Sequence, residues 1–322
     1  MDNRLLTVTS SPHVRASYNT KTIMLDVIIA LLPALAVSIY YFGMSAAVLV
    51  IVSVLTCVVC EAGYEKILHK ESTIGDLSAV VTGILLAFNM PSSAPWWMAV
   101  CGGIFAIVIA KMLYGGIGKN FVNPALAGRA FLMASWSANM TSFPVPGVFD
   151  GTTAATPLSY MKDVAANGMP PQTLTDLFLG NVGGCIGEVS ALALLIGGAY
   201  LVFKKVISIR IPAAYIGTVA VLTLIFPRMG AGTNVTSMLY EVLSGGLLLG
   251  AIFMATDYTT SPVTPRGQLI FGIGCGLLTV FIRYFGGYPE GVSYSILLMN
   301  LCVWLIDRYT TPKKFGEVAK KA

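Results

Sequence analysis

The middle of the chain carries a short loop of small and hydroxyl-bearing residues, FDGTTAATPLS, at residues 149–159. The sequence on either side is strongly apolar, so this loop divides one hydrophobic chain into two halves. Pro157 disfavours a helical backbone at the preceding Thr156. Glycine and alanine neighbours leave the threonine hydroxyl with little steric cover. The loop is therefore either a plain turn or a place where a hydroxyl group can be modified.

The composition excludes an ordinary soluble domain. Of the 322 residues, 56% are hydrophobic and only 11% are charged, whereas soluble domains contain about 25% charged residues. A helix needs about 20 apolar residues to cross the hydrocarbon core of a bilayer. Ten runs approach this length, which predicts an all-α polytopic membrane protein with about ten transmembrane helices. These runs are residues 23–42, 45–64, 76–90, 96–113, 121–137, 189–203, 213–226, 242–256, 269–285 and 292–306.

The positions of lysine and arginine test this number of spans. With ten crossings, seventeen of the 20 basic residues lie on one side and only Lys162, Arg228 and Arg283 lie on the other. This asymmetry is typical of the positive-inside rule, and removing any single span would destroy it. We therefore expect both termini in the cytoplasm and the central loop outside. The net charge of +5 is explained by these anchors rather than by nucleic acid, because no basic stripe is interleaved with aromatic residues.

Each half contains five runs, an odd number, so similar halves would be inverted relative to one another. The motif KMLYGG at 111–116 closes the fourth run, and RYFGG at 283–287 closes the ninth. Inverted repeats with short or broken helices usually enclose a site near the bilayer midplane, although an aromatic residue followed by two glycines is also a common helix ending. The predicted organisation is a cytoplasmic segment 1–22, a five-helix half 23–137, an extracytoplasmic loop 138–175, a second five-helix half 176–307 and a cytoplasmic tail 308–322.

Several short motifs follow one another along most of the chain. They are SPH at 11–13, NPALAGRAF at 123–131, DGTTAATPL at 150–158, GNVGGCIGE at 180–188, MATDYTTSP at 254–262 and GYPEG at 287–291. Together they resemble RnfD, the D subunit of the Rnf ion-translocating ferredoxin:NAD oxidoreductase complex. They resemble more distantly NqrB, the B subunit of the sodium-pumping NADH:quinone oxidoreductase. The short N-terminus and the DGTTAATPL motif favour the ferredoxin-linked type.

The resemblance implies a covalently bound FMN. The family carries FMN on a threonine through a phosphoester bond, at a motif of the type Ser/Thr-x-Ala-Thr. The matching residues here are Thr153, Ala154, Ala155 and Thr156, which makes Thr156 the attachment residue; Ala154 stands where the NqrB relatives commonly have glycine. A dedicated flavin transferase is also implied, and in bacteria it generally works outside the cytoplasmic membrane. The charge distribution independently places this loop on that side.

The resemblance also implies partners and a role. The partners are the other subunits of the Rnf complex, including the FMN-carrying G subunit and the membrane A and E subunits, in the cytoplasmic (inner) membrane of a prokaryote. The chain would relay electrons through FMN on Thr156 and through a second, non-covalent flavin such as riboflavin, coupled to Na+ or H+ movement. The sequence carries no dinucleotide fingerprint and no iron–sulfur ligand set. Ferredoxin and NAD are therefore expected to bind to other subunits, and no catalytic residue is assigned here.

Four polar positions within the apolar sequence are candidates for a flavin or ion site. Arg129, one turn into the fifth run, could hold a phosphate or a carboxylate. Glu188 ends the glycine-rich segment 180–187, and irregular backbone in a membrane must be buried or line a cavity. We expect this segment, with Asn181, and Asp257 to line the site. The alternative is that Asn181 and Asp257 only cap helices.

Other polar groups favour simpler interpretations. Lys111 could extend its ammonium group to the membrane surface. Cys57 and Cys60 lie on one helix face, but no second cysteine pair or histidine at ligand spacing accompanies them. Buried cysteine acting as a small apolar residue is the better interpretation, and no metal site is predicted.

Two other functions remain open. A secondary transporter or channel without flavin would also have inverted halves. A passive scaffold for partner subunits would use the central loop only as a turn. The quinone-linked sodium pump is the alternative within the family.

Overall fold

The structure, a computed structural model, describes residues 19–147, 153, 155–162, 170–228 and 234–312. In these ranges the chain is helical and forms no strand; two isolated bridges join Pro91 to Cys185 and Pro144 to Thr153. The predicted all-α polytopic class is therefore confirmed. The SPH motif, Ala154 of the predicted attachment motif and most of the C-terminal tail lie outside the described residues.

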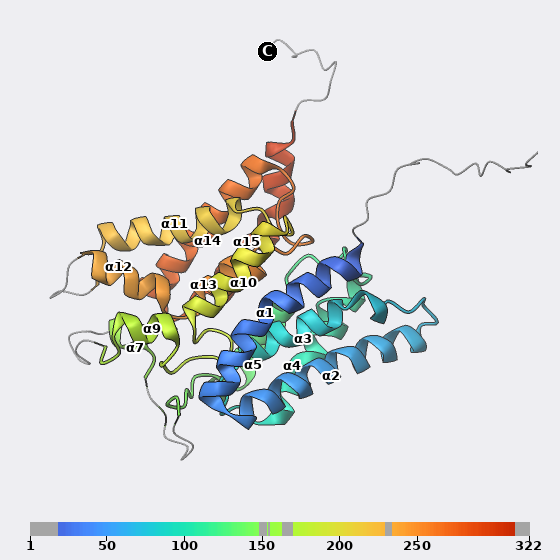
Figure 1. Ribbon diagram of the computed structural model, residues 1–322. Coiled ribbons are helices and arrows are strands. Elements are labelled where there is room, and N and C mark those ends of the chain that lie inside the picture. Colours follow the sequence, from blue (N-terminus) through green and yellow to red (C-terminus); the bar gives the residue numbers. More distant parts are fainter. Residues whose placement is uncertain (1–18, 148–152, 154, 163–169, 229–233, 313–322) are drawn as a thin grey trace, which may run out of the picture.

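The first half contains five of the predicted runs in the predicted order (Figure 1). Its α-helices are α1 (Thr20–Phe42), α2 (Met44–Ile67), α3 (Ser78–Phe88), α4 (Trp96–Ile104) and α5 (Pro124–Ser135). The 3-10 helix η1 (Ile74–Asp76) precedes α3, and the π-helix η2 (Phe105–Ile109) and the 3-10 helix η3 (Met112–Tyr114) continue α4. Three short helices follow, α6 (Ser137–Met140), α7 (Pro157–Lys162) and α9 (Leu174–Leu179).

The second half contains the other five runs. Its elements are α10 (Ala191–Phe203), α11 (Arg210–Ile225), α12 (Asn234–Leu243), α13 (Leu247–Leu249), the π-helix η4 (Gly250–Met254), α14 (Pro265–Phe285) and α15 (Val292–Thr310). The sequence predicted one continuous helix at residues 242–256, and this prediction was wrong because the segment is bent and starts earlier. The segment begins earlier, at Asn234, and bends by 62° between α12 and α13. Gly245 permits this bend because it adopts a positive φ of 66° at the break.

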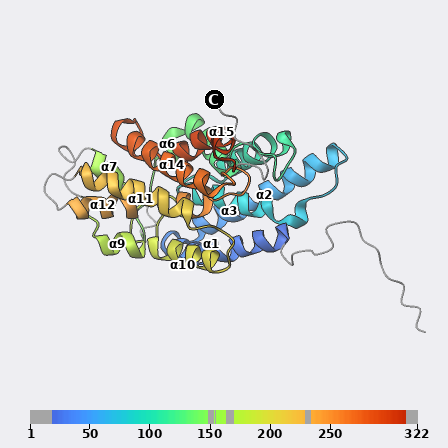
Figure 2. The same cartoon turned by 90° about the horizontal axis from the view of Figure 1, so that it is seen from above.

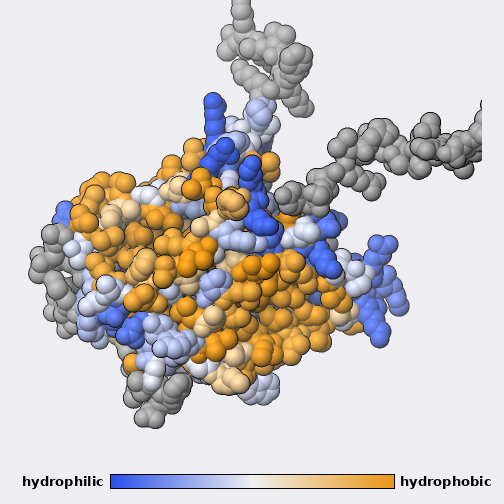
Figure 3. All heavy atoms as spheres, viewed as in Figure 1, coloured by the Kyte–Doolittle hydropathy of each residue, from blue (hydrophilic) through white to orange (hydrophobic). Residues whose placement is uncertain are grey.

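Four helical segments in the described ranges are long and apolar enough to cross a membrane alone. They are α1, α2, the run Trp96–Tyr114 and α14, and the bent pair of α12 with Leu247–Met254 would make a fifth. The other apolar helices are shorter. A broad apolar surface covers α1 and α2 in the view of Figure 3. On α2 the side chains of Ile51, Leu55 and Val59 are more than half exposed. In a bilayer these side chains face lipid.

The two halves repeat one pattern of helix contacts. In the first half α2 packs against both α3 and α4, and in the second half α11 packs against both α12 and α14. The halves meet where α1 lies beside α10 and where α5 contacts α15, as Figures 1 and 2 show from two directions for α1 and α10. This repetition is what two related five-helix halves predict. The domain boundaries proposed from the sequence stay a prediction.

The contact between α1 and α10 depends on a glycine. A Cβ atom added at Gly197 would lie 2.1 Å from the backbone oxygen of Ala30. We expect Gly197→Ala to force the two helices apart and to destabilise the fold by about 1–3 kcal/mol, as overpacking does. Thermal unfolding in detergent measures this loss. Gly217→Ala on α11 is the matched control, because nothing lies within 4 Å of its added Cβ; an equal loss there would contradict the proposed role of Gly197.

Candidate functional site

Thr156 lies at the start of α7 and is the N-cap of this helix. Its backbone oxygen accepts hydrogen bonds from Ser159 N at 2.9 Å and Tyr160 N at 3.2 Å, and its Oγ1 accepts one from Ser159 N at 3.3 Å. Pro157 occupies the first helical position, which suits proline because no amide hydrogen is needed there. The Thr156 residue is 9% exposed. The hydroxyl predicted as the attachment site is therefore held in a fixed place rather than on a free loop tip.

A cavity of about 290 Å³ lies beside this hydroxyl. Thr156 and Ala155 form part of its wall, whereas Thr153 is exposed. The rings of Tyr288 and Tyr294, also in the wall, are stacked with centroids 6.3 Å apart. The rest of the wall is Arg129, Ala130, Met133, Thr141, Phe143, Ser159, Pro289, Glu290 and Ser293. We call this space the Thr156 cavity; its aromatic walls and few polar groups suit a planar heteroaromatic ring.

Arg129 forms part of the wall of this cavity and is 4% exposed. Its Nη1 donates to Asn89 Oδ1 at 2.7 Å and to Glu188 Oε1 at 3.3 Å. Its Nη2 donates to Glu290 Oε2 and contacts Cys185 Sγ at 3.8 Å. The sequence analysis offered a phosphate or a carboxylate as the partner of Arg129. The structure shows that its partners include two carboxylates of its own chain, the buried Glu188 and the half-buried Glu290.

The loop that carries Cys185 and Glu188 is irregular and buried, as its glycines predicted. Its amides reach the end of α3, because Gly187 N donates to Phe88 O and Ile186 N donates to Met90 O, both at 2.9 Å. A side chain at Gly187 would collide with Phe88, whose Cβ lies 2.3 Å from the added atom. Glycine at this position therefore allows the loop to place Glu188 against Arg129.

The same cluster satisfies the distance criterion for a metal site, but its charge does not suit one. Single ligand atoms of Cys185, Glu188 and Glu290 all lie within 4.8 Å of one another. The Arg129 guanidinium contacts all three residues. Because the Arg129 cation already contacts both carboxylates and would repel a second cation placed among them, we assign the cluster to an ion-pair network rather than to a metal.

Asp257 and Asn181 do not join Glu188, so the single site expected from the sequence is divided. Asp257 lines a second cavity of about 410 Å³, together with Lys111, Ser78 and Asn123. Asn181 is exposed and lines neither cavity. Hydrogen bonds from the Thr173 side chain and amide lower the pKa of the Asp176 carboxyl group, and one from Asn181 adds to this shift.

The two cavities are joined by buried polar contacts along α5. Pro124 and Ala125 line the second cavity, and Arg129, about one turn further along, lines the Thr156 cavity. Between them Asn123 Nδ2 donates to Met254 O at 3.3 Å, and Asn89 Nδ2 approaches Met254 Sδ at 3.6 Å. Groups bound in the two cavities would therefore be close neighbours.

Lys111 does not reach the membrane surface, contrary to the sequence interpretation. It is 2% exposed and its Nζ donates to Glu61 Oε2 at 2.8 Å and to Ser78 Oγ at 2.6 Å. The segment that echoes it in the other half begins with Arg283, which is also buried. The two echoing segments thus each begin with a buried cation.

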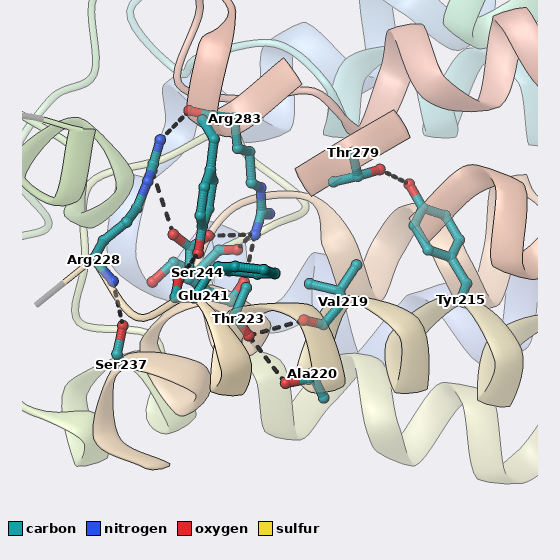
Figure 4. Close-up of polar contacts among 12 residues, drawn as sticks. Tyr215, Val219, Ala220, Thr223, Arg228, Ser237, Glu241, Ser244, Thr279 and Arg283 are labelled. Carbon is teal, nitrogen blue, oxygen red and sulfur yellow. Dashed lines mark hydrogen bonds and ion pairs between the residues drawn. The ribbon is translucent and has the colours of Figure 1, made fainter. Parts of the chain in front are cut away.

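Figure 4 shows the network around Arg283, where two arginines point toward Glu241. Arg283 Nη1 lies 2.9 Å from Glu241 Oε2, and Arg228 Nη1 lies 3.3 Å from Glu241 Oε1. Gly245 connects this network to the Thr156 region, because a Cβ there would lie 2.6 Å from Leu158 and 3.0 Å from Glu290 Oε1. The sequence similarity between the segments that begin with Lys111 and Arg283 was the one pattern that pointed to Arg283. No sequence pattern indicated that Arg228 and Arg283 contact Glu241.

Comparison with known proteins is consistent with this architecture. Residues 7–316 match the model of the NQR2, RnfD, RnfE family. A relative from Acetobacterium woodii, the D subunit of its Na(+)-translocating ferredoxin:NAD(+) oxidoreductase complex, is 54% identical over 100% of this chain and 99% of its own length. The proton-translocating counterpart of Clostridium ljungdahlii is 44% identical over 97% and 96%. The D subunit of the ion-translocating oxidoreductase complex of Actinobacillus pleuropneumoniae is 36% identical over 96% and 98%.

These matches define a class of polytopic membrane subunits of redox complexes. The chain belongs to the NQR2, RnfD, RnfE family. The resemblance to RnfD that the motifs indicated is confirmed.

Proposed function

We propose that this protein is the D subunit of an ion-translocating ferredoxin:NAD+ oxidoreductase and relays electrons through FMN carried on Thr156. The relatives over the full length of the chain are D subunits of such complexes. The observation that carries the flavin assignment is the position of Thr156, whose side chain lies in the wall of a cavity with aromatic residues. FMN in that place would supply the electron-carrying ring.

The residues of the Thr156 cavity fit the ring in shape and in their hydrogen-bonding groups. Tyr288 and Tyr294 offer flat apolar surface, and Ser293 and Thr141 offer hydroxyl groups at the wall. Arg129 supplies a guanidinium group in the wall, and Glu188 and Glu290 hold it in place. Because Glu290 in the same wall offsets its charge, Arg129 would act on the ring as a positioned hydrogen-bond donor rather than as a net positive charge.

The second cavity, beside Asp257, is the proposed place for a non-covalent flavin such as riboflavin. Its volume of about 410 Å³ is within the range of small-molecule sites. Asn120, Asn123 and Ser78 in its wall could hydrogen-bond the carbonyl and amide groups of such a ring. Ion movement, by Na+ or H+, would be coupled to electron passage between the two places.

We further propose that the complex lies in the cytoplasmic membrane of a prokaryote, with the termini inside and α7 outside. The partners would be the other Rnf subunits, including the G, A and E subunits, and a flavin transferase. The lysine and arginine distribution supports this orientation. A membrane-impermeant amine reagent on intact cells tests it, since Lys162 is exposed and should react, whereas the cytoplasmic lysines should not.

The intact mass of the chain, taken from the native complex, tests the flavin assignment. We expect one FMN phosphoester in addition to the mass of the sequence, on the peptide that contains Thr156. A chain at the bare sequence mass in an active complex would contradict the proposal and favour a transporter or a scaffold without covalent flavin.

A further inference from the structure

Two glutamates near the end of α2 are buried on the same face of the helix. Glu61 is 1% exposed and Glu65 is 3% exposed. Residues four apart are neighbours on a helix, and like charges at this spacing repel one another. Burying a carboxylate is very costly unless it is paired with a cation or fully hydrogen-bonded.

The hydrogen bonds leave one oxygen of Glu65 without a partner. Lys111 Nζ donates to Glu61 Oε2 at 2.8 Å, and Thr73 Oγ1 donates to Glu61 Oε1 at 2.8 Å. Glu65 Oε1 accepts from Thr73 N at 3.0 Å and lies against the same Thr73 hydroxyl. One hydroxyl hydrogen cannot serve two carboxylates at once. Glu65 Oε2 is buried and has no partner among the described residues.

The charges around this pair leave it negative. Lys111 is the cation that contacts Glu61, and it divides its donors between Glu61 and Ser78. Asp76, which accepts bonds from Ser78 N at 2.8 Å and Ser78 Oγ at 2.6 Å, adds a further carboxylate. The side chains of Lys66 and Lys70 are exposed. Glu61, Glu65 and Lys111 together therefore carry one excess negative charge.

We propose that Glu65, with Glu61 and the Thr73 hydroxyl, binds a monovalent cation, Na+. All of these ligand atoms are oxygens, which hard cations prefer. One positive charge neutralises the excess, whereas a second would be opposed by the Lys111 ammonium group. This inference rests on the proposed function, because a translocating subunit needs a place where the ion enters. The lysine distribution puts this end of α2 on the cytoplasmic side.

The site shares a side chain with the second cavity. Lys111 and Ser78 line that cavity and Lys111 contacts Glu61. A negative charge gained in the cavity attracts the Lys111 ammonium group and weakens its hold on Glu61. The two glutamates then bind a cation more strongly. Electron arrival and cation binding are thereby linked through one lysine.

Carbodiimide labelling of the purified native complex tests the site. The reagent modifies buried protonated carboxyl groups, and a bound Na+ prevents this by displacing the proton. Without Na+ we expect Glu65 to be labelled, as seen by mass spectrometry of the α2 peptide. At a Na+ concentration about ten times the dissociation constant, the labelling rate should fall about tenfold. Choline chloride at equal ionic strength should not protect.

A variant pair controls the assignment. Glu65→Gln should remove the label, whereas Glu71→Gln, at an exposed position a few residues further on, should leave both labelling and protection as in the wild type. Labelling of wild-type Glu65 at the same rate with and without Na+ would overturn the proposal. Absence of labelling in Na+-free buffer would overturn it as well. Neither result depends on how well the variants fold.

The outcome is separable from the flavin assignment. Thr156→Val removes the proposed attachment hydroxyl, but it should leave Na+ protection of Glu65 intact. A wild-type complex that carries covalent flavin, but in which Na+ does not protect Glu65 from labelling, would contradict only the proposed cation site. A complex in which Na+ protects Glu65 but which carries no covalent flavin would contradict only the flavin assignment.

Discussion

Thr156→Val should abolish covalent flavin on this chain. Valine has nearly the shape of threonine but no hydroxyl, so no phosphoester can form. On a denaturing gel of the complex produced with its flavin transferase, the band of this chain should lose its flavin fluorescence completely. Ferredoxin-driven NAD+ reduction by the assembled complex should fall to background, because the relay loses its carrier.

Two neighbouring variants are the controls for this loss. Thr153→Val changes an exposed threonine of the same motif, whose backbone pairs with Pro144, and the fluorescent band should persist. Thr156→Ser keeps a hydroxyl and the N-cap of α7, so it should retain part of the flavin. A fluorescent Thr156→Val band would refute the attachment site. A dark band with undiminished electron transfer would instead indicate a scaffold.

The second large effect is expected at Arg129. Arg129→Met leaves the buried Glu188 and the half-buried Glu290 together without their cation. Removing one partner of a buried ion pair typically destabilises a protein by about 3–5 kcal/mol. We expect a lower melting temperature of the solubilised complex and loss of order around the Thr156 cavity. Tm by intrinsic fluorescence, with proteolysis near α7, would measure both.

A double variant separates the charge from the loss of the arginine itself. In Arg129→Met with Glu290→Gln, one of the two unpaired carboxylates becomes neutral. This double variant should be more stable than Arg129→Met alone, so the two substitutions should be non-additive. Arg129→Lys should fall between wild type and Arg129→Met, because lysine keeps the charge but cannot reach Asn89, Glu188 and Glu290 at once. Additive losses would show that Arg129 and Glu290 do not act as a pair.

The sequence predicted the helices well where the signal is local. Run lengths and the positions of glycine and proline define α1, α2 and α14. Asn123 and Pro124 mark the start of α5, where Asn123 Oδ1 accepts from Ala125 N at 3.1 Å. The bend at Gly245 was missed, because an apolar run does not record a change in direction.

The candidate site was predicted only in part, for a physical reason. Thr156 and Arg129 were both singled out, and both line one cavity. Their partners were not predicted, because Arg129 contacts Asn89 and Glu290, which lie 40 and 161 positions away in the chain. Periodicity encodes which face of a helix is buried but not which distant side chain meets it. Asp257 and Glu188 were grouped for the same reason, although Asp257 lines the second cavity and Glu188 does not.

The 9% exposure of Thr156 has a consequence for biogenesis. If this side chain carries FMN, a transferase must reach its hydroxyl group. That hydroxyl is largely covered once α7 lies against Leu243, Gly245 and the loop of Glu290. Flavin addition would then precede the docking of α7. The order of events would be insertion, flavinylation and closure, and a chain that closes too early would be a dead-end product.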